Sequence, residues 1–269
     1  MIRLNRFLTI ATVAVAGALG VQSGAIHQAG AAELNVISAG AMRSALQELA
    51  PEFEKTSGHK LKIEYGTAGA VEKKAGAEDA EYDVVILTKP RMDDLVKKAK
   101  VAGGATAVLF RAPIAVAVKE GAPKPDISTD EKFKQALLNA KSIAYVDPAS
   151  GGTSGIHIAK VLEKLGIADQ VKAKTKLVSA GPGQGSPRVG EPVARGEAEI
   201  GIQPISELNE VKGIAVVGPL PEDLQSPDLV YVAGAPMLTE QPIAAKALID
   251  FLNGPKANEV YKAKGVQPM

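Results

Sequence analysis

Small and hydroxyl-bearing residues gather at three places in the sequence, each where a short apolar run passes into a helical pattern. These places are residues 38–43, 66–70 and 147–155. Small residues let a ligand approach the backbone closely, and the free N–H groups at the start of a helix attract anions. In open α/β sheets, ligands bind outside the carboxyl ends of the strands. The three junctions together therefore predict a binding site for a small anion.

Nine residues in or near these junctions are candidates for contact with the ligand. They are Ala41, Arg43, Thr67, Lys89, Ser150, Thr153, Ser154, Arg188 and Gln203. Ordinary roles compete with this one. Arg43 could be a solvated charge on its helix, and Lys89 could merely cap the buried strand that it follows. One of the three hydroxyls after residue 149 is expected to cap a helix. Arg188 lies in a Gly- and Pro-rich loop, which is either a plain surface loop or a functional one.

The sequence gives little indication of catalysis. His157 stands between Ile156 and Ile158, so a packed or surface histidine is the simpler interpretation. If the protein is an enzyme, His157 is a candidate general base, because the pKa of histidine lies near neutral pH. The sequence has no nucleophile elbow, no phosphate-binding loop and no histidine pair at metal spacing. Cysteine is absent, which excludes disulfides and thiolate chemistry, and we expect neither a metal nor a cofactor.

The elements that must position these residues alternate between strand and helix. Residues 34–38, 61–65 and 84–87 predict the first strands, and 84–87 is apolar throughout, as in a parallel strand buried on both faces. Such alternation indicates an α/β fold. We expect two doubly wound lobes with a ligand cleft between them, the first built from residues 33–112 and 203–269 and the second, inserted, from 113–202. One large sheet is the alternative.

The first 32 residues have the pattern of a secretory signal peptide. Arg3 and Arg6 precede the apolar run 7–21, and small residues lead to Ala31 and Ala32. Cleavage there would leave a mature chain that starts near Glu33. A membrane anchor is the alternative, but the apolar run is short for a spanning helix. We therefore expect an exported protein that works in the periplasm and is not inserted in the membrane after cleavage.

Composition narrows the possible partners. The chain has 31 basic and 30 acidic residues, and removal of Arg3 and Arg6 would leave a net charge of −1. A nearly neutral chain offers no electrostatic surface for nucleic acid or an anionic membrane. Tryptophan is absent, so sugar binding by indole stacking is not expected. The predicted partner is a small anionic ligand.

From Glu33 onward the chain resembles the periplasmic solute-binding proteins of the molybdate-binding superfamily. The resemblance is carried by residues 38–41, 65–67, 82–86 and 147–148, and by the segment 193–202 with its Arg-Gly-Glu-Ala sequence. It implies the type II periplasmic binding-protein fold and a monomer that serves the membrane permease of an ABC transporter. In molybdate binders, hydroxyls at the first two junctions and a late tyrosine hold the oxyanion. Here Ala41, Ala68 and Gln203 stand at or near those places, which argues against molybdate.

Arg43 indicates a different ligand class. Arginine grips a planar carboxylate through two parallel hydrogen bonds, whereas neutral donors suffice for a tetrahedral oxyanion. The runs 121–128, 133–135, 144–151 and 203–208 also resemble the bacterial periplasmic aconitate isomerases, which interconvert cis and trans tricarboxylic acids. We therefore favour a receptor for a di- or tricarboxylate. The alternative is an aconitate isomerase, which would act by an allylic proton shift on the same fold.

Overall fold

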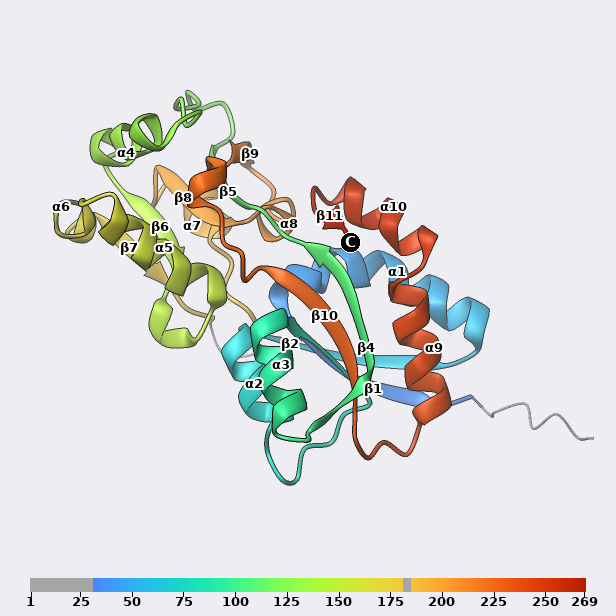
Figure 1. Cartoon of the computed structure of the whole chain (residues 1–269). Helices are drawn as coiled ribbons and strands as arrows, with labels where there is room; N and C mark the ends of the chain where they lie inside the picture. Colours follow the sequence, from blue (N-terminus) through green and yellow to red (C-terminus); the bar gives the residue numbers. More distant parts are fainter. Residues whose placement is uncertain (1–30, 181–184) are drawn as a thin grey trace, which may run out of the picture. The chain divides into compact units, whose positions relative to one another are not determined.

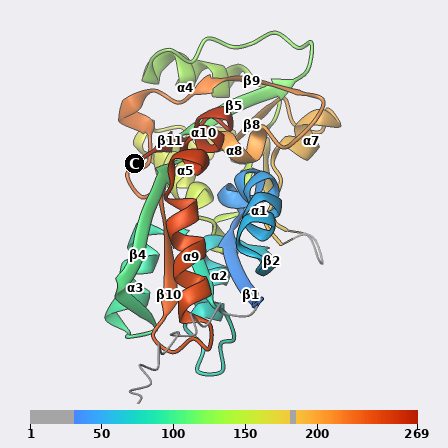
Figure 2. The ribbon, with the colours of Figure 1, turned by 90° about the vertical axis from the view of Figure 1, so that its right-hand side faces the viewer.

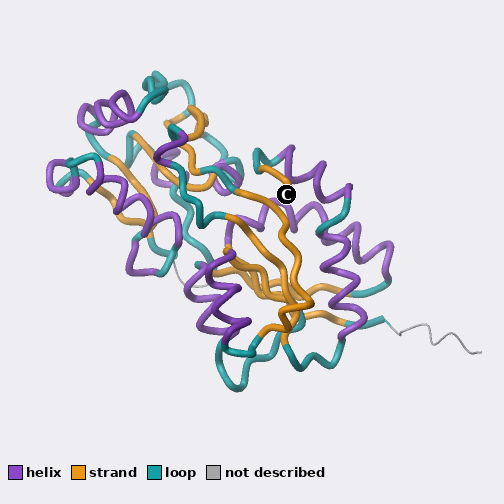
Figure 3. The backbone as a smooth tube through the Cα atoms, in the orientation of Figure 1, coloured by secondary structure: helices purple, strands orange, loops and turns teal. Residues whose placement is uncertain are grey.

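The computed structural model of the protein describes residues 31–180 and 185–269, which form two β-sheets (Figure 1). Residues 1–30 of the predicted signal peptide lie outside the described residues. The strands of both sheets are flanked by helices, as Figure 3 shows in orange and purple. The expected α/β architecture of two doubly wound lobes is confirmed, and the alternative of one large sheet is wrong.

The first sheet has six strands, in the order β11-β4-β10-β3-β1-β2. β1, β2 and β3 are parallel, and β10 runs antiparallel between β3 and β4. The strands are β1 (Glu33–Ala39), β2 (Lys60–Gly66), β3 (Val84–Thr88), β4 (Val101–Arg111), β10 (Val230–Pro236) and β11 (Gln267–Pro268). All five residues of β3 are buried, as its apolar sequence predicts.

Helices cover both faces of this sheet. α2 packs against α3, and α1 packs against α9 and α10. In Figure 2, α1 and α9 lie on the face turned to the viewer. The helices are α1 (Arg43–Ser57), α2 (Ala68–Ala75), α3 (Lys89–Lys97), α9 (Pro242–Leu252) and α10 (Pro255–Ala263), and the 3-10 turn η1 (Gly40–Met42) precedes α1.

The second sheet has five strands, in the order β7-β6-β8-β5-β9. They are β5 (Ile114–Lys119), β6 (Ile143–Val146), β7 (Thr175–Val178), β8 (Ile200–Pro204) and β9 (Ile214–Pro219). The helices with them are α4 (Asp130–Asn139), α5 (Thr153–Lys164), α6 (Ala168–Lys172), α7 (Gly190–Ala194) and α8 (Ile205–Leu208), with the short turns η2 (Pro148–Ser150) and η3 (Glu222–Leu224).

Alternation along β6 gives this sheet two packed faces. Ile143 and Tyr145 join the main core together with residues of α5, whereas Ala144 and Val146 join a separate cluster with residues of α7. Side chains of one strand point alternately to opposite faces, so α5 and α7 cover opposite sides.

The second sheet extends past residue 203, where we expect the chain to return to the first lobe. β8 continues to Pro204, and β9 pairs with β5 through partners such as Lys119 and Ile214. Residues 203–219 therefore belong to the second sheet. The apolar run 214–217 predicts a strand, but its pairing depends on β5, about a hundred residues earlier, which periodicity does not reveal. β5 also runs antiparallel to β8, so both sheets are mixed.

The chain passes between the sheets twice, between β4 and β5 and between β9 and β10. These two crossings are side by side, because Ala112 N–H donates to the Leu229 carbonyl at 2.9 Å. The Gln225 side chain accepts from Ile114 N–H at 2.9 Å and donates to Ile114 O at 3.0 Å. The two segments that connect the sheets are thus hydrogen-bonded to each other.

Candidate functional site

A small pocket lies where the carboxyl ends of β1, β2 and β6 meet. Its volume is about 30 Å³, room for about one water molecule. The lining comes from all three predicted junctions and from three further segments. The lining residues are Ala39, Gly40, Ala41, Gly66, Thr67, Ala68, Val146, Gly152, Thr153, Ser154, Ser186, Pro187, Glu207 and Tyr231.

The first junction contributes a backbone with no room for a side chain. A Cβ atom at Gly40 would lie 2.9 Å from Glu207 Oε2 and closer still to Ser186 Oγ. Two polar groups therefore reach this turn because residue 40 is glycine. Ala41, which follows, is buried and lines the pocket.

The second and third junctions are bonded to each other across the pocket. Thr67 Oγ1 donates to the Ser150 carbonyl at 2.7 Å, and Gly69 N–H donates to the Gly151 carbonyl at 3.1 Å. Arg91, which pairs with Glu72, donates to the same Gly151 carbonyl at 3.2 Å. These three bonds join α2 and α3 to the turn before α5, so they hold the pocket closed.

The start of α5 supplies donors. No side chain caps this helix, whose N-cap residue is Gly152, so its first N–H groups are available at the pocket. Thr153 Oγ1 is buried, and within residues 31–180 and 185–269 it has no hydrogen-bond partner. Ser154 is buried beside it. Unpaired donors in this position fit an anion.

Glu207 is an ionisable residue of the pocket lining that the sequence analysis missed. It is half-buried at the pocket, and its Oε2 accepts from Gln203 Nε2 at 2.8 Å. Desolvation, with repulsion from Glu210 second, raises the pKa of Glu207 to about 8. The place of Glu207 shortly after β8 can be read from the sequence, but its approach to the first junction cannot, because that approach depends on how the two sheets are ordered.

Gln203 does not line the pocket, but its side chain holds the Glu207 carboxyl in place. It is fully buried, its Oε1 accepts from Val189 N–H at 2.9 Å, and its Nε2 also donates to Pro187 O at 3.0 Å. Because the amide oxygen is engaged by Val189, the amide nitrogen must face Glu207. Gln203 thus orients Glu207 from behind.

Arg43 is buried behind the pocket wall. Its Nη2 donates to Ser186 Oγ at 2.8 Å, its Nη1 lies 3.7 Å from Glu210 Oε2, and its guanidinium stacks on the Tyr65 ring at 4.8 Å. Arg43 therefore reaches the pocket through Ser186, which lines it. Since Ser186 Oγ accepts from Arg43, its own proton remains available to a ligand.

The structure does not bring the other predicted residues to the pocket lining. Lys89 is exposed and pairs with Asp93 at 2.7 Å, because the first turn of α3 directs it outward. Ser150 Oγ donates to the Asp147 carbonyl, which leaves only its backbone facing Thr67. Arg188 lies 3.7 Å from Glu210, and His157 Nε2 lies 2.9 Å from the Leu224 carbonyl near the crossings. Of the predicted contacts, the pocket brings together Ala41, Thr67, Thr153 and Ser154.

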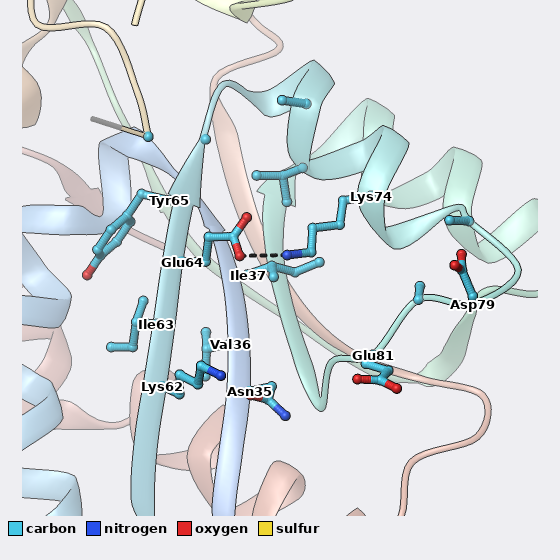
Figure 4. A pocket seen from close by; sticks show the side chains of 16 residues that line it. Asn35, Val36, Ile37, Lys62, Ile63, Glu64, Tyr65, Lys74, Asp79 and Glu81 are labelled. Atoms are coloured by element: carbon cyan, nitrogen blue, oxygen red, sulfur yellow. Dashed lines mark hydrogen bonds and ion pairs between the residues drawn. The ribbon is translucent and has the colours of Figure 1, made fainter. Parts of the chain in front are cut away.

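A larger groove of about 1290 Å³ lies beside β2, away from the junction hydroxyls (Figure 4). The Glu64–Lys74 ion pair, 2.6 Å long, spans it, and Tyr65 lies on the other side of the strand. Its charged lining has both signs, including Lys62, Asp79 and Glu81. The groove follows the edge of the sheet and does not meet the carboxyl ends of β1 and β6, so we assign the site to the smaller pocket.

Two α/β lobes with a small, hydroxyl-lined pocket at the ends of their strands are typical of a solute-binding protein. The chain belongs to the family of bacterial extracellular solute-binding proteins, whose family model matches residues 34–267. In the part of the chain that the structure describes, no helix is long and apolar enough to cross a membrane.

Relatives of the chain include an aconitate isomerase and molybdate-binding proteins. The chain is 35% identical over 242 residues to an aconitate isomerase from Pseudomonas sp., covering 88% of each chain. It is 28% identical over 235 residues to the molybdate-binding protein of Escherichia coli K12, covering 87% of this chain and 88% of the relative. The periplasmic molybdate-binding protein of Azotobacter vinelandii shares the fold, with a TM-score of 0.70 at 22% identity, covering 87% of this chain and 98% of that one.

Proposed function

We propose that the protein is a periplasmic receptor that binds a carboxylate with two or three acid groups between its sheets and delivers it to an ABC-type permease. One observation carries the proposal: Thr153 Oγ1 is unpaired in the described residues and stands at the start of α5, where Ser154 and Ser186 also line the pocket. Such a set of donors suits an anion.

The carboxylate class has separate support. The relative at 35% identity acts on a tricarboxylic acid, and the molybdate binder is more distant, at 28%. Ala41 and Ala68 line the pocket and offer no hydroxyl to a tetrahedral oxyanion. Arg43 lies behind the pocket wall and donates to Ser186 Oγ, so that the hydroxyl proton of Ser186 is left for a ligand oxygen.

Ligand entry requires the two sheets to move apart, because a pocket of about 30 Å³ is smaller than any carboxylate of this class. The bonds that must open are those of Thr67 with Ser150 and of Gly69 and Arg91 with Gly151. The paired crossings near Ala112 and Leu229 are the natural hinge, since only two chain segments connect the sheets.

Thermal melts with a panel of anions test the ligand class. The panel contains trans-aconitate, citrate, malate, sulfate and molybdate, with chloride at matched ionic strength as the control. A ligand at about 100 times its Kd stabilises the folded state by roughly 2.7 kcal/mol, which a melt resolves. We expect the tricarboxylates to raise Tm most. A shift with molybdate alone contradicts the proposal.

Isomerisation of aconitate is the second candidate. Glu207 and Tyr231 are the ionisable residues among the described lining, so the pocket holds a carboxyl that could move a proton. In the reaction, a base removes a proton from the methylene carbon and the C–H electron pair forms a new C=C bond. The π pair of the old C=C bond then takes up a proton at the former vinylic carbon. Incubation with trans-aconitate, followed by chromatography for cis-aconitate, separates an enzyme from a receptor.

Export by a cleavable signal peptide is part of the proposal. β1 begins at Glu33, so a cut after Ala31 or Ala32 leaves every strand intact. The cut after Ala31 also keeps two bonds of Ala32, whose N–H donates to His59 Nδ1 at 3.1 Å and whose carbonyl accepts from Lys60 at 2.8 Å. We expect the mass of protein recovered from the periplasm to correspond to a chain that starts at Ala32.

A further inference from the structure

We propose that Glu207 carries a proton when the pocket is occupied, so that its neutral carboxyl donates a hydrogen bond to the ligand. This inference rests on the proposed function, since it requires an anion in the pocket. It adds a determinant of specificity: the site would select ligands that offer an acceptor oxygen to a carboxylic acid.

The lining of the pocket carries the inference. Its described members, Glu207 apart, are small, apolar, hydroxyl-bearing or phenolic, so no cation lies on the described wall. Two anions in contact inside a protein repel each other strongly unless a cation or a proton lies between them. A ligand carboxylate that meets the hydroxyls of Thr153 and Ser186 also meets Glu207. The arrangement is consistent only if one of the two carboxyl groups is neutral.

Nearby arginines do not take the place of the proton. α8 packs against η1, α1, β5, β8 and β9, and the charged groups that act on Glu207 are Arg43, Arg188 and Glu210. Both arginines lie 3.7 Å from the Glu210 carboxylate, whose side chain is only 8% exposed. Their charge is therefore largely compensated by Glu210. The remaining ionisable neighbour, Tyr231, is itself kept neutral by burial, which raises its pKa.

The carboxyl is also built to be neutral before a ligand arrives. Desolvation raises its pKa to about 8, and a bound anion would raise it further. Gln203 donates to Oε2, which leaves Oε1 to carry the proton. The group therefore binds a proton at neutral pH and loses it above about pH 8 when the pocket is empty.

Titration calorimetry with trans-aconitate, and in a second arm with molybdate, tests the coupling. The carboxyls of the ligand ionise near pH 4, so they do not change between pH 6 and 9.5. We expect the affinity of the wild type to be constant from pH 6 to 7 and to fall by about tenfold per pH unit above pH 8. Glu207→Gln keeps a neutral donor, so it should bind with an affinity that no longer depends on pH. Glu163→Gln, an exposed change on α5, is the matched control and should follow the wild type.

Two results overturn the inference. Loss of binding in Glu207→Gln at every pH would mean that a neutral donor at this position is not sufficient, and a flat profile in the wild type would mean that Glu207 does not titrate with binding. If neither probe binds at pH 6, the proposed ligand class fails instead. The proton is then followed on the free protein by carbon NMR of labelled glutamate. A resonance that titrates near pH 8 and vanishes in Glu207→Gln supports the inference, and titration near 4.5 refutes it.

Discussion

Gly69 N–H donates to the Gly151 carbonyl at 3.1 Å, and this bond joins α2 of the first sheet to the turn that precedes α5 of the second. The two backbones meet so closely that a Cβ atom at Gly69 would lie 3.0 Å from the Gly151 oxygen. Closure of the pocket therefore depends on direct backbone contact between two glycines, which side chains at either position would hinder.

A side chain at Gly151 should weaken ligand binding more than it weakens the fold. Gly151 has φ +74°, and a Cβ there would lie 3.2 Å from Gly69 Cα. Gly121 has φ +81° with open space around it, so it is a matched control. Alanine at either position costs about 1 kcal/mol of stability through backbone strain. We expect only Gly151→Ala to lower affinity, by about tenfold, in titration calorimetry. Equal affinity in both variants would show that close approach at Gly69 is not needed.

Removal of the Gln203 side chain should damage both stability and binding. Val189 N–H, which is buried, would lose its acceptor, and an unpaired buried donor costs about 1–3 kcal/mol. Glu207 would lose the group that orients it. Urea unfolding and calorimetric titration of Gln203→Ala should show both losses. Gln135→Ala, on the exposed side of α4, should show neither. Full affinity in Gln203→Ala would show that Gln203 is not needed to position Glu207.

Gly155 is required for α5 to start close to β6. A Cβ atom there would overlap the Val146 carbonyl oxygen, which is backbone and does not yield easily. Gly155→Ala should cost about 1–3 kcal/mol by overpacking and should displace Thr153 and Ser154. Gly104→Ala has open space and should be nearly neutral. The midpoint of urea unfolding distinguishes the two, and an unchanged midpoint in Gly155→Ala would contradict the packing.

Stability of the free protein should fall as pH rises from about 4.5 to 8. The pKa of Glu207 is about 8 in the folded state and near 4.5 in the unfolded chain, so the folded state holds the extra proton in this window. Deprotonation on the way to pH 8 therefore costs the folded state stability, on the order of a few kcal/mol. Burial raises the pKa of Glu210 as well, which adds to the same trend.

Urea midpoints measured every half pH unit check this slope. Glu207→Gln should flatten it and should be more stable than the wild type at pH 8. Asp126 and Glu197 do not interfere, because their pKa values are lowered to about 2 and their contributions are lost only below about pH 4. A wild-type midpoint that rises from pH 5 to 8 would show that Glu207 is ionised in the folded protein.

The sequence located the strand ends but not everything that meets them. The junctions at residues 38–43, 66–70 and 147–155 could be predicted because periodicity marks where each strand stops, and all three line the pocket. Ser186, Glu207 and Tyr231 could not, because their approach depends on sheet order. Lys89 is a candidate because it follows the buried β3, but position after a strand does not fix side-chain direction, and Lys89 pairs with Asp93.

The adjacency of Ala112 and Leu229 has a consequence for how such proteins can diversify. The inserted sheet leaves and rejoins the first sheet at points separated by a single hydrogen bond. A segment whose two ends lie side by side can be exchanged as one cassette without lengthening either connection. Recombination at these two points would combine the first sheet of one ancestor with the inserted sheet of another. A new ligand specificity would then arise from a new pairing of existing pocket residues.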